Sequence, residues 1–184
     1  ASGVPIEGEA GLGYVMRDGY DLPPLMFTND EIVALVAGAR MIKAWGGAGM
    51  AAAAEEALIK IETVLPEPAR RRAAAVAVYA IGMPQMNDDL RFRIDAVEQA
   101  TEARQRLKID YADEDGALSN RIVRPLGLWF WGKVWTLVAW CELREDFRMF
   151  RVDRITSMEE LGPYRPQKGQ TLRDFYARPD HRQH

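Results

Sequence analysis

The spacing of hydrophobic and polar residues divides the chain into a helical part and a β part. From Thr28 to about residue 46, apolar residues recur every three or four positions, which predicts an amphipathic helix. The segment 28–31 has the form of a capping box, and the Gly-Gly pair at 46–47 ends this helix. By the same spacing we expect further helices at about 50–65 and 88–104. The alanine-rich residues 69–80 lack this clear spacing and could form a short helix that leads into an irregular stretch at 82–84.

Beyond residue 104 the period changes to two, the spacing of half-buried strands. Leu107, Ile109 and Tyr111 alternate with charged residues, and the Asp-Glu-Asp-Gly sequence at 113–116 supplies a hairpin turn. Further strands are predicted at 118–130, 134–142 and 147–153, and a short last one near Ile155. Both faces of the strand at 134–142 are apolar, so we expect it to be buried on both sides. A helix followed by five antiparallel strands indicates an α+β fold and suits a small barrel.

Composition restricts the classes of protein to which the chain can belong. With 184 residues, of which 48% are hydrophobic, it can bury a core. No apolar run approaches the roughly 20 residues that span a bilayer, and no signal peptide is visible, so we expect a soluble, cytoplasmic protein with no membrane partner. The single cysteine, Cys141, excludes an internal disulfide framework and is expected to be a buried structural thiol.

The sequence offers no candidate set of catalytic or metal-binding residues. Its two histidines, His181 and His184, lie in the C-terminal tail, far from Cys141 in sequence, and cannot complete a zinc site with it. The clustered carboxylates at 88–89 and 113–115 fall at helix starts and turns, where capping and solvation explain them. We therefore predict no metal, no cofactor and no enzymatic activity.

Positive charge is concentrated in the predicted strands. Residues 118–154 contain seven basic and four acidic side chains, a surplus of three in a chain whose net charge is -3. Four of the five tryptophans lie in the same region, between 121 and 155. Arginines mixed with aromatic side chains on a small barrel are typical of surfaces that hold single-stranded nucleic acid. An anionic partner is therefore expected.

Three motifs in this region carry a family resemblance. They are R-x-V-x-P-L at 121–126, G-x-x-W-x-L-V-A at 132–139 and R-x-F-R-x-D-R-I at 148–155. In this order they resemble the WYL-domain family of bacterial transcription regulators, and residues 19–28 resemble the junction between the winged helix-turn-helix and the effector portion of those proteins. The resemblance implies a ligand-sensing, Sm-like (SH3-type) barrel and an upstream domain that binds operator DNA. One departure is Thr136, which stands where the family has the tyrosine of its Trp-Tyr-Leu triplet.

The resemblance and the pattern together predict four segments. Residues 1–20 would be the remnant of a winged-helix wing, so that the chain lacks most of the N-terminal DNA-binding domain. Residues 21–86 would form a helical linker that dimerises through alanine-rich faces, giving a homodimer. Residues 87–162 would be the five-stranded WYL barrel, and residues 163–184 a tail with a short helix near 171–177.

Seven side chains are candidate ligand residues: Tyr111, Arg121, Trp135, Thr136, Arg148, Arg151 and Arg154. The four arginines are assigned to phosphate contact, because a guanidinium matches phosphate geometry. Tyr111 and Trp135 are assigned to stacking or to the wall of the site. A regular strand cannot direct Arg148, Arg151 and Arg154 at one ligand without a bulge. Two structural alternatives stay open: Trp135 as a core residue and Arg151 paired with Asp153.

These observations predict the effector-sensing portion of a transcription regulator. It would bind a negatively charged ligand, single-stranded nucleic acid or a nucleotide, and so control DNA binding by an upstream winged helix-turn-helix. A second hypothesis is a protein-interaction module that docks a partner such as RNA polymerase. Strong dependence of ligand binding on salt would favour nucleic acid over protein.

Overall fold

The computed structural model describes residues 26–76, 80–82, 84 and 86–178, and the backbone of residues 6–7 and 15–16. The two short strands β1 (Ile6–Glu7) and β2 (Val15–Met16) pair in antiparallel fashion. Apart from these two pairs of residues, the expected wing remnant at 1–20 lies outside the described residues, so that assignment stays a prediction.

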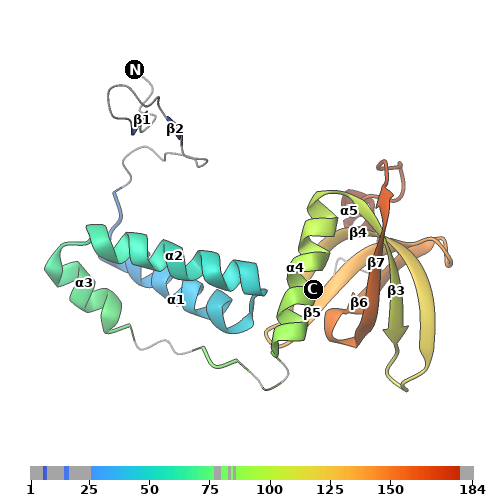
Figure 1. Ribbon diagram of the computed structural model, residues 1–184, viewed down its shortest axis with the longest axis horizontal. Helices are drawn as coiled ribbons and strands as arrows, with labels where there is room; N and C mark the ends of the chain where they lie inside the picture. The colour runs from blue at the N-terminus through green and yellow to red at the C-terminus, as the bar shows by residue number, and fades with distance from the viewer. Residues whose placement is uncertain are drawn as a thin grey trace.

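The first two helices, α1 (Asn29–Trp45) and α2 (Ala48–Val64), lie side by side, and the short α3 (Glu67–Ala74) follows them (Figure 1). The predicted capping box is present, since the Thr28 hydroxyl accepts the Glu31 N–H and the Glu31 carboxylate accepts the Thr28 N–H at 2.7 Å. Five buried residues form the core of this unit: Ile32, Val36, Leu58, Ala73 and Val76.

The short helix differs from its predicted bounds at both ends. It begins at Glu67, because Pro68 lies in its first turn, where the missing N–H costs no hydrogen bond. It ends at Ala74, before the predicted limit of residue 80. Ala73 is buried against the chain's own helices, so this alanine is not available to a second subunit. Residues 77–79 of the same alanine-rich stretch lie outside the described residues.

The fourth helix, α4 (Asp88–Glu102), covers one face of the sheet (Figure 1). Asn87 caps it, and its side-chain oxygen accepts the Leu90 N–H at 2.9 Å. Every third or fourth residue is buried, and this stripe consists of Leu90, Ile94, Val97 and Ala100. The stripe fixes the side of the helix that faces the strands.

The sheet has five antiparallel strands, which are β3 (Gln105–Ala112), β4 (Leu118–Phe130), β5 (Trp135–Cys141), β6 (Asp146–Arg151) and β7 (Ile155–Pro163). Their order is β6-β5-β4-β3-β7, so the last strand pairs with the first, and a 3-10 turn at Val152–Arg154 joins β6 to β7. The α+β class is confirmed. Among the described residues no ladder joins β6 to β7, so the sheet is open and a closed barrel stays a prediction.

Both faces of β5 are buried, as the pattern predicted. Leu137, Ala139 and Cys141 face the core under α4, and Val138 packs in a second cluster with Phe147 and Phe175. Phe175 belongs to α5 (Leu172–Tyr176), the short helix predicted in the tail, which Thr171 caps. No helix in the described part of the chain is long and apolar enough to cross a membrane.

We expect the α4 stripe to carry much of the stability of the sheet unit. Ile94 has no exposed surface, so Ile94→Ala should lower the free energy of unfolding by about 2–5 kcal/mol in chemical denaturation. Phe92 lies two residues away on the same helix and is 64% exposed, so Phe92→Ala is the matched control. It should change stability by no more than about 0.5 kcal/mol. Equal losses for the two variants would contradict the packing described here.

Candidate anionic-ligand groove

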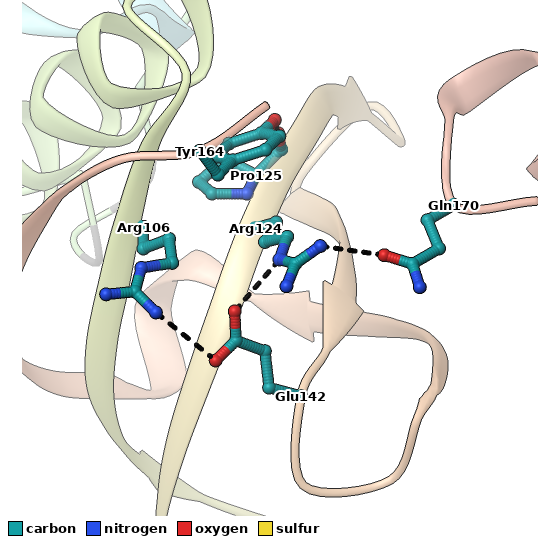
Figure 2. A network of polar contacts seen from close by, with 6 residues as sticks. All are labelled: Arg106, Arg124, Pro125, Glu142, Tyr164 and Gln170. Atoms are coloured by element: carbon teal, nitrogen blue, oxygen red, sulfur yellow. Dashed lines mark hydrogen bonds and ion pairs between the residues drawn. The ribbon is translucent and has the colours of Figure 1, made fainter. Parts of the chain in front are cut away.

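One arginine of the basic region is used to hold the tail on the sheet. The Arg124 Nε lies 2.9 Å from Glu142 Oε1, and its Nη1 donates to Gln170 Oε1 at 2.8 Å (Figure 2). Arg106 approaches the other oxygen of Glu142 at 3.7 Å. The guanidinium of Arg124 is mostly buried, and its Nε and Nη1 are engaged, so we assign it to structure and not to ligand binding.

Tyr164 binds the residue that follows Arg124 in β4. The Tyr164 hydroxyl donates to the carbonyl of Pro125, and the Tyr164 ring lies beside the Pro125 ring (Figure 2). Burial raises the pKa of Tyr164, so the phenol stays protonated and keeps its donor. The register of β4 and β5 shifts between Pro125 and Gly127, because proline has no N–H for the ladder.

Arg151 is paired as the structural alternative proposed. Its Nε and Nη2 donate to the two carboxylate oxygens of Asp153 at 3.1 and 2.7 Å. The hydrogen bonds that Arg151 donates to Asp153 raise the pKa of Arg151, so the guanidinium stays charged. Asp153 thus occupies the Nε–Nη2 edge of the Arg151 guanidinium, which is an edge that could otherwise bind a phosphate with two parallel hydrogen bonds.

Three other arginines line one groove. The groove has a volume of about 610 Å³ and lies between the β3–β4 hairpin and the β5–β6 hairpin. Its charged lining consists of Arg121, Arg144, Arg148 and Asp113, and its other lining residues include Tyr111, Leu118, Met149 and Phe150. Within the described residues, none of these three arginines forms an ion pair with a carboxylate. Three guanidinium groups are therefore available in this groove.

Two acidic groups near the groove are already engaged. Asp113 Oδ1 accepts the backbone N–H groups of Asp115 and Ala117 at 3.0 and 2.8 Å, and so holds the β3–β4 turn. Asp146, at the start of β6, pairs with Arg178 at 2.6 Å. The hydrogen bond from Arg178 lowers the pKa of Asp146, and nearby Arg148 adds to the effect.

The aromatic member of the groove is held at a fixed angle. The ring of Tyr111 meets the ring of Phe150 edge to face, with centroids 5.1 Å apart and an interplanar angle of 82°. The Tyr111 hydroxyl accepts the backbone N–H of Arg151 at 3.4 Å. The Tyr111 ring therefore lines the groove in a fixed orientation, while its hydroxyl is hydrogen-bonded to the backbone of β6.

The predicted ligand residues do not form one site. Tyr111, Arg121 and Arg148 lie together in the groove. Trp135 and Arg151 line a separate cavity of about 170 Å³, together with Met86, Leu90, Lys133, Val134 and Asp153. Thr136 is buried in β5, and Arg154 is half-buried in the turn between β6 and β7 and lines neither space.

Trp135 packs against other aromatic residues at one side of the 170 Å³ cavity. Its Nε1 donates to the Trp45 carbonyl at 2.6 Å, and its ring packs against Phe130 with centroids 5.1 Å apart. Phe130 in turn contacts the ring of Trp45, with centroids 5.7 Å apart. Trp135 thus joins the sheet to the end of α1, and it is half-buried against the core under α4.

Arg144 was not among the predicted ligand residues, because it falls between the predicted strands at 134–142 and 147–153. Its position between two paired strands was the available signal, since the turns at one end of a meander lie close to one another. No group of three or more metal-ligating side chains occurs in the described ranges.

Comparison with known proteins identifies the domain. Residues 77–160 match the WYL domain family. Protein PafC of two Mycobacterium tuberculosis strains is 32% identical over 140 residues, covering 76% of this chain and 40% of that protein. Protein PafC of Mycobacterium leprae is 30% identical over 140 residues, covering 75% of this chain and 42% of that protein.

A solved structure is similar as well. Proteasome accessory factor B/C (PafBC) of Arthrobacter aurescens shares 27% identity over 81% of this chain and 22% of that chain, with a TM-score of 0.41. The chain spans about 40% of the length of the PafC proteins that it matches. The matched residues 77–160 contain α4 and the strands from β3 into β7, and this segment of the chain is a WYL domain.

Proposed function

We propose that this chain is the sensing portion of a transcription regulator and that the groove binds an anionic ligand. The ligand would be single-stranded nucleic acid or a nucleotide, and its binding would control operator binding by a winged helix-turn-helix. The match to the WYL domain family supports the regulatory role. The observation that carries the ligand class is the convergence of Arg121, Arg144 and Arg148, none of them paired with a described carboxylate, beside Tyr111.

The chemistry of the groove fits a phosphorylated ligand better than a simple carboxylate. Each guanidinium can donate two parallel hydrogen bonds to phosphate oxygens, and three of them suit a ligand with more than one phosphate. Tyr111 offers a ring on which a base can stack, and base–aromatic stacking contributes about 1–3 kcal/mol per base. Leu118 and Met149 add apolar surface beside it. The net charge of -3 works against nonspecific nucleic-acid binding, so the attraction is local.

A second candidate function is a protein-docking module. The observation that favours it is the exposure of large apolar side chains on the turns of the sheet, which are Leu118, Trp131 and Leu143. A partner such as RNA polymerase could cover them. Such binding would depend weakly on salt and would not require the groove arginines.

We expect the chain to bind single-stranded oligonucleotides more tightly than duplex of the same length. The free arginines and Tyr111 lie in one groove on a small sheet, which suits splayed bases rather than a stacked duplex. Fluorescence anisotropy at two salt concentrations measures both affinities. Equal or tighter duplex binding would contradict the proposed ligand, and the absence of any binding would favour the docking module.

Replacing an arginine should weaken oligonucleotide binding only where that arginine lines the groove. Arg121→Met and Arg148→Met should each weaken oligonucleotide binding and reduce the slope of log affinity against log salt by about one. Both should leave the free energy of unfolding within about 0.5 kcal/mol of the wild-type value.

Two further variants of the same charge change serve as controls. Arg151→Met should leave oligonucleotide affinity nearly unchanged, because its donors are engaged by Asp153. Arg165→Met removes an exposed arginine outside the groove lining and should also have little effect. If all four variants lost affinity equally, general charge rather than the groove would be responsible.

We propose in addition that the helical unit dimerises. Its exposed apolar side chains lie on α1 and α2 and are Leu35, Met41, Ile42, Ile59 and Val64. Sedimentation at micromolar concentration should give a dimer, and Leu35→Glu on α1 should shift it toward monomer. Phe92→Glu, on the exposed side of α4, is the control and should leave the dimer intact. A wild-type monomer at that concentration would remove the proposal.

A further inference from the structure

The turn between α1 and α2 is held by side chains of the WYL domain. The Arg91 guanidinium donates to the carbonyls of Ala44 and Gly46 at 3.0 and 2.8 Å, and the Trp135 indole donates to the carbonyl of Trp45 at 2.6 Å. The last carbonyls of a helix have no partner within the helix, so these donors complete the end of α1. The positive charge of Arg91 also suits the negative end of the helix.

The start of α2 is completed from the same helix of the WYL domain. Gly47, in the capping position, has no side chain that could cap α2, and Asp95 Oδ2 accepts the Gly49 N–H at 2.8 Å. Arg91 and Asp95 are four residues apart on α4 and therefore lie on one face. This face presents a cation to the end of α1 and a carboxylate to the start of α2.

The fit at this turn is so close that a side chain at Gly47 would displace the Asp95 carboxylate. A Cβ at Gly47 would lie 1.9 Å from Asp95 Oδ1, whereas a Cβ at Gly49 would make an ordinary contact of 3.6 Å with the same carboxylate. The backbone of Gly47, with φ -60° and ψ 169°, is accessible to any residue, so only the approach of Asp95 excludes a side chain. We call Arg91, Asp95 and Trp135, with the backbone of 44–49, the helix joint.

The helix joint is connected to the groove through β6. Trp135 and Arg151 line the same cavity of about 170 Å³, and Arg151 pairs across the sheet with Thr136, the neighbour of Trp135. The backbone N–H of Arg151 donates to the hydroxyl of Tyr111, which lines the groove. The empty volume beside Trp135 leaves space for its indole to turn away from the Trp45 carbonyl.

We infer that occupation of the groove loosens the helix joint, so that the WYL domain passes its ligand state to α1 and α2. This inference rests on the proposed function, because it concerns the regulation of the same groove. A ligand that stacks on Tyr111 withdraws the hydroxyl from Arg151 and frees the end of β6 beside Trp135. The indole then leaves the Trp45 carbonyl, and one of the contacts that hold α1 is lost.

Hydrogen exchange on the 184-residue chain tests the coupling. The probe is a single-stranded oligothymidylate, and the amide of Gly49, which donates to Asp95, reports on the helix joint. Saturating oligonucleotide should speed exchange in the segment 44–49 by about fivefold or more, the lower range of allosteric coupling. Exchange in the centre of α4 should stay unchanged, because its residues lie in the core.

Two variants open the helix joint without touching the groove. Gly47→Ala places a methyl group against Asp95, and Trp135→Phe removes the indole donor while keeping a ring. Both should show fast exchange at 44–49 without oligonucleotide. Because coupling is reciprocal, both should bind the oligonucleotide more tightly, by up to the factor by which it speeds exchange in the wild type. Gly49→Ala and Trp129→Phe are the matched controls and should behave like the wild type.

The outcomes separate the two proposals. If the wild type does not bind the oligonucleotide, the proposed function fails and the coupling falls with it. If the wild type binds while exchange at 44–49 stays constant, the coupling alone is overturned. Gly47→Ala or Trp135→Phe with wild-type affinity, or with weaker binding, would also overturn it, even if exchange had increased.

Discussion

The packing of α4 on the sheet is the constraint on which the other features depend. Ile94 and Val97 are fully buried against strand residues such as Leu107 and Val123, and this fixes the rotation of the helix. Because the apolar stripe faces the strands, the direction in which each flanking residue of α4 points is also fixed. Arg91 and Asp95 face the α1–α2 turn, and Phe92 faces solvent. The apolar core thus sets where the charged contacts between the two halves occur.

Charge in this protein is divided between structure and recognition. Arg106 and Arg124 hold Glu142, Arg151 holds Asp153, and Arg178 holds Asp146. Surface ion pairs contribute only about 0–1 kcal/mol each, so their main effect here is to fix positions and to neutralise carboxylates. Asp146 is occupied by Arg178, and Asp113 is hydrogen-bonded to its own turn. None of the groove arginines forms an ion pair with a described carboxylate, so all three can meet an incoming anion, with Asp113 as the one carboxylate among the described lining residues.

The elements of the fold could be predicted from the sequence because each has a local signal. The capping box at Thr28, the Gly-Gly pair after α1 and the turn before Leu118 gave bounds close to those observed. α3 was less well bounded, because its alanine-rich sequence has no periodic contrast and no clear stop. The open edge between β6 and β7 and the bulge after Pro125 depend on tertiary pairing, which periodicity does not report.

The candidate site was predicted only in part, for a geometric reason. The sequence assigned both Arg148 and Arg151 to phosphate contact, which a regular strand allows only with a bulge. In the structure the two line different spaces, and only Arg148 lines the groove. The hydrogen bond between the Trp135 indole and the Trp45 carbonyl joins residues 90 positions apart. No local sequence pattern predicts such a contact. Thr136 is 6% exposed and lines neither space, so the position where the WYL triplet has a tyrosine lies outside the groove of this chain. The phenol in the groove is that of Tyr111 on β3, and its hydroxyl accepts the backbone N–H of Arg151. A ring that lines the groove is therefore in direct contact with β6, which ends beside the cavity that Trp135 lines.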